Sequence, residues 1–539
     1  AGSLWFALLS LTAPARAAEM KFDVVEATVA DIQAAYRAHT LTAHQLVQLY
    51  LDRIAAYDKK GPAINCIVTV NPAALAEADK LDEAFAKTGK FVGPMHGIPI
   101  LVKDEIDAAG MPTTLGTVVF KDYRPPLDAF VVGKLRAEGA IVLAKTTLSE
   151  FAGGDTYSAL TGNSRNPYAL DRTVGGSSGG SGGALAANFG MLALGEETSS
   201  SLKRPAAWGA LTGMRATPGL ISRSGMWDGH PVPTAQMGPM SRTVTDLAKL
   251  LDAMVGYDPE DPITAFGIMH TPKTYTAFLD KDGLRGARIG VIRESIGGGS
   301  QPDAAYGKKG EDIWQSALGE LKAAGATVVD IVIPDLKELM SKRASDPALN
   351  DAALHVYLSR NPNSPFKTRA DIDNDPAMAT SFKTISAEYR RAHGGGAGGF
   401  GRGSSFGRGP ADPAKILEAE RARQQLLMNI AKVMADNQLE ALAFKTVEHQ
   451  PSLIAEAAFP PYKSLGGTVT LNTFLIYTPV ITVPMGFSSD GIPAGLGLLG
   501  LPFSEPDLLK LGYAYEQATH HRKPPASTPP LGASSLVVK

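Results

Sequence analysis

The chain has 539 residues, of which 44% are hydrophobic and 20% are charged, and its formal net charge is −2. This composition can bury a large core, and the near-neutral charge excludes a basic surface that would recruit nucleic acid or anionic lipid. The single cysteine, Cys66, excludes an internal disulfide and any cysteine-based metal site.

The first residues are typical of the apolar part of a secretory signal. The run from Leu4 to Leu11 is too short to span a bilayer, Pro14 follows it, and Ala15-Arg16-Ala17 is a small-residue cleavage sequence. A buried N-terminal helix is the alternative. We expect residues 1–17 to be the remnant of a signal peptide and the protein to be periplasmic or secreted. No later segment has about 18 unbroken apolar residues, so we expect no membrane span.

Helical and strand-like patterns alternate along the chain. Residues 42–45, Thr-Ala-His-Gln, form a capping box, and Leu46, Tyr50, Ile54 and Tyr57 then recur at helical spacing. Short apolar runs bounded by glycine or proline follow at 98–102, 140–144, 191–194, 288–292 and 327–333. Such runs between helices predict an α/β fold with a sheet covered on both faces.

Two segments fit such a sheet poorly. From 341 to 460 the pattern is mostly helical, and it contains a glycine-rich stretch over 394–409. With so many glycines this stretch gains little from ordering, so we expect a mobile loop or the edge of a lid. An RNA-binding tail is the alternative, although two arginines in an acidic protein give it little support. Residues 525–539 are typical of a loose C-terminal tail.

Three residues in glycine- and serine-rich loops form the most informative pattern. They are Lys103 in GIPILVKDEID, Ser177 in VGGSSGGSGG and Ser201 in GEETSSSLKRPA. A lysine that can be kept neutral, a bridging serine and a nucleophilic serine make an acyl-transfer site that needs neither histidine nor metal. We therefore expect an enzyme without a metal or a cofactor.

These motifs resemble the amidase signature family. In that family a Gly-Gly-Ser-Ser-Gly-Gly element precedes a second serine, and here Ser201 follows Ser177 by the family's spacing of 24 residues. Matching segments also begin at Lys145 (KTTLSEFA), Gly162 (GNSRNPY), Gly213 (GMRATPGLISRSG) and Gly238 (GPMSRTVTDLA), and two more lie near the C-terminus. The resemblance covers roughly residues 25–524 and implies one domain over 18–524. Its fold would be a twisted mixed β-sheet wrapped by helices, with a mainly helical insertion over 295–460.

The resemblance also implies a mechanism. Ser201 would attack a carbonyl carbon and form an acyl-enzyme, Ser177 would relay its proton, and a neutral Lys103 would accept it. An unperturbed lysine has a pKa of about 10.4, so burial at the end of the run 98–102 would have to lower it. The neighbouring carboxylates Asp104, Glu105 and Asp107 would raise it if they lay close to the amine.

The same resemblance implies further site residues. The peptide at Ser177 would be cis, Ser178 would support its loop by hydrogen bonding, and Phe151 to Gly153 would line the acyl or leaving-group pocket. Backbone N–H groups of Thr198, Ser199, Ser200 and Ser201 would form the oxyanion hole.

The nucleophile loop departs from the family motif Gly-Thr-Asp-x-Gly-Gly-Ser-Ile-Arg. Here the residues from Gly195 to Lys203 read GEETSSSLK, so Ser199 and Ser200 replace two glycines and Lys203 replaces an arginine. A positive φ at either serine would carry strain, and Lys203 would pair with Glu197 as a point charge.

Other functions remain open. The string from Gly175 to Gly179 also satisfies G-x-S-x-G, which would make Ser177 the nucleophile of an α/β-hydrolase with His449, His520 or His521 as base. A glutamine-dependent transamidase subunit would need a partner, and a binding protein on an inactive scaffold is a third alternative. A glycine-serine string can also be a linker or a phosphate loop. The amidase hypothesis implies a small amide, carbamate or ester substrate and no nucleic-acid partner. It leaves open whether the protein is a homodimer.

Overall fold

The computed structural model describes residues 22–227, 229–298, 304–344, 346–393, 412–462 and 468–531. The predicted signal segment 1–17 and the glycine-rich stretch 394–409 lie outside these residues. Within these ranges no helix combines the length and the apolar character needed to cross a membrane.

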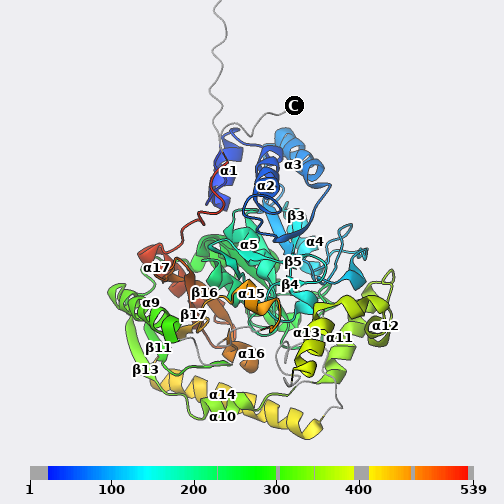
Figure 1. Cartoon of the computed structure of the whole chain (residues 1–539). Coiled ribbons are helices and arrows are strands. Elements are labelled where there is room, and N and C mark those ends of the chain that lie inside the picture. The colour runs from blue at the N-terminus through cyan, green and yellow to red at the C-terminus, as the bar shows by residue number, and fades with distance from the viewer. Residues whose placement is uncertain are drawn as a thin grey trace, which may run out of the picture.

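A mixed sheet of eleven strands forms the centre of the described molecule (Figure 1). Its strands are, in chain order, β1 Ile67–Val70, β2 Pro99–Lys103, β3 Ile141–Thr146, β8 Leu192–Glu197, β9 Thr212–Arg215, β10 Gln236–Ser241, β11 Arg288–Ile292, β13 Thr327–Ile331, β14 Ala441–Lys445, β16 Val480–Phe487 and β17 Pro493–Leu499. Their spatial order is β1-β3-β2-β8-β10-β9-β16-β17-β14-β11-β13. β2 runs parallel to β3 and β8, β11 runs parallel to β13 and β14, and the other neighbours are antiparallel. The predicted mixed α/β sheet is confirmed.

Helices surround this sheet. They are α1 Val29–Arg37, α2 Ala43–Tyr57, α3 Ala74–Thr88, α4 Phe130–Ala137, α5 Gly179–Ala186, α6 Lys203–Trp208, α7 Val244–Met254, α8 Thr264–Ile268, α9 Ala304–Ala323, α10 Leu336–Ser341, α11 Pro347–Arg360, α12 Arg369–Asp373, α13 Phe382–Ala392, α14 Pro413–Asp436, α15 Ile454–Ala457, α16 Leu471–Leu475 and α17 Glu505–Thr519. Short strands also form ribbons, namely β4 Tyr157–Ser158 with β5 Gly162–Asn163, β6 Arg165–Asn166 with β7 Ala169–Thr173, and β12 Gly297–Gly298 with β15 Thr468–Val469.

Side chains alternate between the two faces of the sheet, as strand geometry requires. Along β14, Ala441 and Ala443 belong to the main core, which includes residues of α9 and α17. Leu442 and Phe444 belong to a second core, which includes residues of α14. Each of these four side chains is at most 1% exposed, so the sheet is buried on both faces at this strand.

The structure contains the elements that the local sequence signals predict. The capping box is present, since the Thr42 hydroxyl accepts the N–H of Gln45 at 3.1 Å and α2 begins at Ala43. Each of the five predicted apolar runs lies in a strand, within a few residues of its predicted bounds.

The boundaries of the expected insertion differ from the sequence-based prediction. The interval 295–460 contains β13 and β14, which belong to the main sheet. Parallel strands need a crossover connection, and here α9 joins β11 to β13 while the helices α10 to α14 lie between β13 and β14. Within this second connection, α10 and α14 contribute to the second core. Tyr357 and Phe366, which lie between them in the chain, form a separate apolar cluster with Phe151 and Trp227.

The first part of the expected C-terminal tail makes specific contacts. The buried Arg53 donates to the carbonyls of Thr528 and Pro529, and the Ser527 hydroxyl donates to Pro167 O at 2.6 Å. Residues 532–539 lie outside the described residues.

Candidate active site

Lys103 is the last residue of β2 and is fully buried, as the preceding apolar run predicts. Its Nζ donates to Ser177 Oγ at 2.7 Å. The structure therefore brings together two of the three residues that the sequence places in the reaction.

Two carboxylates flank the same amine. Nζ lies 2.6 Å from Glu105 Oε1 and 2.9 Å from Glu196 Oε2. Burial lowers the pKa of Lys103, but the charges and hydrogen bonds of Glu105 and Glu196 raise it more, so this pKa lies above that of an ordinary lysine. These contacts favour the ammonium form of Lys103 in the resting site, whereas the mechanism that the resemblance implies uses the free amine. Burial also raises the pKa of Glu105 well above its usual range, and the nearby Glu196 raises it further against the opposing charge of Lys103.

The other two acidic neighbours of Lys103 have different partners. Asp104 accepts the hydroxyl and the N–H of Thr114 and lies 3.9 Å from Lys145 Nζ. Asp107 accepts the hydroxyl of Tyr357, from α11, at 2.9 Å. Burial raises the pKa of Asp107 to about 6. Of the three carboxylates that the sequence flags, only Glu105 is in contact with Lys103.

Ser177 lies in a tight loop before α5. The Gly176–Ser177 peptide is cis, as the resemblance implies, and Ser177 is fully buried. A β-carbon at Gly180 would lie 2.3 Å from the carbonyl oxygen of Thr147, so only glycine allows α5 to begin this close to the end of β3. Ser178 supports the loop, because its hydroxyl donates to Glu196 O at 3.0 Å and accepts the N–H of Glu196 at 3.1 Å.

Ser201 follows β8 and is 8% exposed. Its carbonyl accepts the N–H of Ser178 at 3.0 Å, which joins the two serine-bearing loops directly. The N–H groups of Thr198, Ser199, Ser200 and Ser201 donate to no acceptor in the described part of the chain. Neither Ser199 nor Ser200 has a positive φ, so the replacement of glycine adds no left-handed strain there.

A buried ion pair lies at the start of α6, which follows Ser201 in the chain. Lys203 Nζ lies 2.7 Å from Glu197 Oε1, and Glu197 Oε2 accepts the N–H groups of Leu202 and Lys203. Burial raises the pKa of Glu197, but Lys203 and Arg215 lower it more, and the carboxylate stays ionised. The predicted pairing of these two residues is present.

Sequence reasoning missed several residues that hold the site. Arg204 donates to the carbonyl of Gly176 at 2.6 Å and pairs with Asp155 at 3.0 Å. From α16, Asn472 donates to Glu197 Oε1 at 3.1 Å and the Thr473 hydroxyl donates to Ser199 O at 3.0 Å. No sequence signal connects α16 with a loop some 270 residues earlier, whereas Glu196 stands where the family motif has threonine and could have been flagged.

Phe151 and Gly153, the expected pocket residues, lie in a short turn after β3. Phe151 is 2% exposed and belongs to the cluster formed with the second connection. Phe151 and Ala152 both have positive φ, at 51° and 55°, a conformation that costs non-glycine residues roughly 1–2 kcal/mol each. Gly153 is half-buried with extended backbone. Strain of this kind is concentrated at functional sites.

The geometry opposes the alternative with Ser177 as an α/β-hydrolase nucleophile. The strand before it, β7, pairs with β6 and lies outside the main sheet. His449 packs against Trp208, His520 ends α17, and His521 lies 2.9 Å from Glu320. None of the three histidines contacts Ser177 among the described residues.

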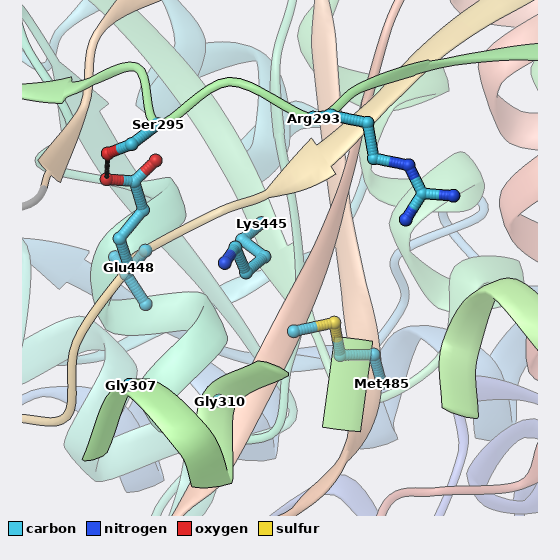
Figure 2. A pocket seen from close by; sticks show the side chains of 8 residues that line it. Arg293, Ser295, Gly307, Gly310, Lys445, Glu448 and Met485 are labelled. Carbon is cyan, nitrogen blue, oxygen red and sulfur yellow. Dashed lines mark hydrogen bonds between the residues drawn. The ribbon is translucent and has the colours of Figure 1, made fainter. Parts of the chain in front are cut away.

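A separate pocket of about 170 Å³ lies at another part of the molecule (Figure 2). Figure 2 shows Lys445 near its centre, with Glu448 and Ser295 on one side and Arg293 on the other. Both cations already have acidic partners, since Arg293 pairs with Asp330 at 2.7 Å and Lys445 with Glu311 at 3.2 Å. None of the residues expected in the reaction lines this pocket.

Known proteins resemble this chain in sequence and in fold. The sequence profile of the Amidase family matches residues 45–509. The chain is 34% identical to a glutamyl-tRNA(Gln) amidotransferase subunit of Thermosynechococcus vestitus, over 90% of this chain and 96% of that protein. It is 31% identical to a probable amidase of Arabidopsis thaliana, over 94% and 92% of the two chains. The crystal structure of the native peptide amidase of Stenotrophomonas maltophilia has 35% sequence identity and a TM-score of 0.76, covering 93% of this chain and 98% of that one.

The chain belongs to the amidase family, and the resemblance to its signature motifs is confirmed. It is a hydrolase that acts on carbon–nitrogen bonds.

Proposed function

We propose that this amidase cleaves a carboxamide, anilide, carbamate or related ester through an acyl-enzyme on Ser201. The observation that carries the proposal is the connection of three residues: Lys103 donates to Ser177 Oγ at 2.7 Å, and the N–H of the next residue, Ser178, bonds to the carbonyl of Ser201 at 3.0 Å. In this proposal Ser201 attacks the carbonyl carbon and loses its proton to Ser177, whose Oγ is hydrogen-bonded to Lys103. A lysine and serine pair can activate a serine in this way without histidine.

The loop around Ser201 supplies the electrostatic part of the proposal. The N–H groups of Thr198, Ser199 and Ser200 have no acceptor among the described residues and can stabilise the oxyanion of the tetrahedral intermediate. Each such donor contributes about 2.7–4 kcal/mol of transition-state stabilisation. Thr473 and Lys203 fix the loop through the carbonyl of Ser199.

Covalent labelling tests the nucleophile. A fluorophosphonate probe, followed by intact-mass measurement, should add one label to the wild type and none to Ser201→Ala. The matched variant Ser177→Ala keeps Ser201 and should label slowly. Labelling that persists in Ser201→Ala and disappears in Ser177→Ala would make Ser177 the nucleophile. A panel of chromogenic anilides, esters and carbamates then identifies the substrate class.

A glutamine-dependent amidotransferase component is a second candidate, favoured by the 34% identity to the amidotransferase subunit of Thermosynechococcus vestitus. This function requires release of ammonia from glutamine and a partner that uses it. Glutamine therefore belongs in the substrate panel. Ammonia release from glutamine that exceeds hydrolysis of every anilide and ester would support the second candidate over the first.

We also propose that the protein is exported, from the apolar segment and small-residue cleavage sequence in residues 1–17. Fractionation of cells that express the chain, with mass determination of the exported form, tests this. Recovery of an uncleaved chain in the cytoplasm alone would contradict it.

A further inference from the structure

Lys103 has three oxygen atoms around its Nζ. They are Glu105 Oε1 at 2.6 Å, Ser177 Oγ at 2.7 Å and Glu196 Oε2 at 2.9 Å, on side chains that are almost fully buried. An ammonium has three N–H donors and no acceptor, so this environment fits the charged form of the lysine. A charged lysine can take the proton of Ser177 only if it gives one of its own protons away.

The two carboxylates differ as destinations for that proton. Glu196 Oε1 already accepts the hydroxyl of Thr198 at 2.6 Å, so the negative charge of Glu196 is held by two donors. Glu105 Oε1 meets no donor other than Lys103 Nζ among the described residues. Hydrogen bonds to a carboxylate favour its charged form, and Glu105 Oε1 has fewer of them, so Glu105 is the carboxylate with room for a proton.

We propose that Glu105 is the terminal proton acceptor of the relay from Ser201 through Ser177, and that Lys103 conducts the proton as an ammonium. The inference rests on the proposed function. Glu196 holds the ammonium in place, and since the family motif has threonine at this position, the second carboxylate is a property of this chain.

The transfer balances at every atom. The Oγ–H bond of Ser201 breaks as Oγ bonds to the carbonyl carbon, and its proton passes to Ser177 Oγ. Lys103 Nζ releases one of its protons to Glu105 Oε1, and the lone pair that this frees takes the original proton of Ser177. Lys103 again has three N–H bonds, and Glu105 is a neutral acid. When the carbon–nitrogen bond breaks, a proton returns along the same chain to the leaving nitrogen.

The pH dependence follows from the charges that face this cluster. Around Glu105 and Glu196 stand Lys145 on β3, Arg215 on β9, Asp104 and Asp107 on the loop after β2, and Glu197 with its partner Lys203. Burial and the neighbouring Glu196 raise the pKa of Glu105. A protonated Glu105 cannot accept a proton, so the rate falls as the pH drops through this raised pKa. Because the groups are strongly coupled, the acidic limb reports the whole cluster.

The test measures kcat over the pH range in which the protein stays folded, using the substrate that the wild type cleaves fastest. Glu105→Gln should lower kcat by about 10²-fold or more and abolish the acidic limb of the wild type, because the acceptor is gone. Glu105→Asp, which keeps a carboxylate, should recover part of the loss. Glu196→Gln should lower kcat less and move the acidic limb to lower pH, because Glu105 loses a like-charged neighbour.

The opposite result would identify a free lysine as the base. If Glu105→Gln has an unchanged or higher kcat, with its acidic limb at lower pH, the proposal is overturned. Infrared difference titration gives a readout independent of turnover, and of whether Glu105→Gln folds. The wild type should show a protonated-carboxyl band that disappears over the acidic limb. This band should move to lower pH in Glu196→Gln, which separates it from the bands of Asp107, Glu150 and Glu516, whose pKa values are also raised. Absence of such a band, or a band that Glu196→Gln leaves unmoved, would also overturn the proposal. Absence of probe labelling on wild-type Ser201 would instead mean that the proposed function fails.

Discussion

Lys203 and Glu197 form a buried ion pair, with 2.7 Å between Nζ and Oε1, directly behind the candidate nucleophile. Glu197 uses its second oxygen to accept the first two N–H groups at the start of α6. The pair therefore fixes the backbone that carries Ser201, although neither residue belongs to the proposed relay.

Replacement of Lys203 should reveal this structural role. Lys203→Met leaves Glu197 charged and buried without its cation, which should lower the free energy of unfolding by about 3–5 kcal/mol. Lys203→Arg keeps the charge and should lose far less. Thermal denaturation of both variants checks the expectation. Equal stability of Lys203→Met and the wild type would contradict it.

Removal of Lys103 should reduce both activity and stability. Lys103→Met breaks the relay, so kcat should fall by about 10²–10⁴-fold. It also leaves Glu105 and Glu196 unpaired, which should cost about 3–5 kcal/mol at a pH where both are ionised. Folded carboxyls with a raised pKa bind more protons than unfolded ones, so this loss should grow as the pH rises and shrink as it falls. A stability deficit that is the same at every pH would argue against unpaired carboxylates.

Arg204 should act on catalysis through the position of Ser177. Its guanidinium binds the carbonyl of Gly176 and the carboxylate of Asp155. A small displacement of reacting groups can cost about 10²-fold in rate, so Arg204→Ala should lower kcat by that order with little change in KM. Arg204→Lys should recover part, because it keeps the charge but not the planar fork. The exposed Arg165→Ala serves as the control and should behave as the wild type.

His449 should make the protein less stable in acid. Burial lowers the pKa of His449 to about 4. In the unfolded chain the imidazole takes up a proton near pH 6.5, whereas the folded one stays neutral until about pH 4, so stability is lost as the pH falls through that window. The loss should approach about 3 kcal/mol, because each pKa unit corresponds to 1.36 kcal/mol. His449→Gln should flatten this part of the stability profile, and an unchanged slope would mean that His449 titrates normally.

Much of the fold was predictable because its signals are local. A capping box, five apolar runs and the two serine motifs each lie within a few residues of sequence, and the structure forms an element or a loop at each of them. The burial of Lys103 follows from the apolar run before it. The expected insertion was too wide: its interval includes β13, which is one of the five predicted apolar runs, and β14, which only its pairing with β11 and β17 assigns to the sheet.

The charge state of the site was not predictable in the same way. Glu105 and Asp107 lie on either side of Ile106, yet one contacts Lys103 and the other bonds to Tyr357. Which carboxylate meets the amine depends on the backbone of this loop and on helices far along the chain. Arg204 belongs to the same motif as Ser201, but its contact with Gly176 exists only in the folded chain. Asn472 lies far from both serines in the sequence, and no spacing rule connects it to the site.

The hydrogen bond from Tyr357 to Asp107 has a consequence for engineering. Tyr357 belongs to α11, and Asp107 stands four residues after Lys103, with the Asn361 amide on its other oxygen at 3.3 Å. A chimera that exchanges α11 for the corresponding segment of a relative would withdraw both donors from a buried carboxylate. The exchanged segment should therefore retain Tyr357 and Asn361, or Asp107 should be replaced at the same time. Either change would keep the loop after Lys103, and with it the position of the lysine, intact.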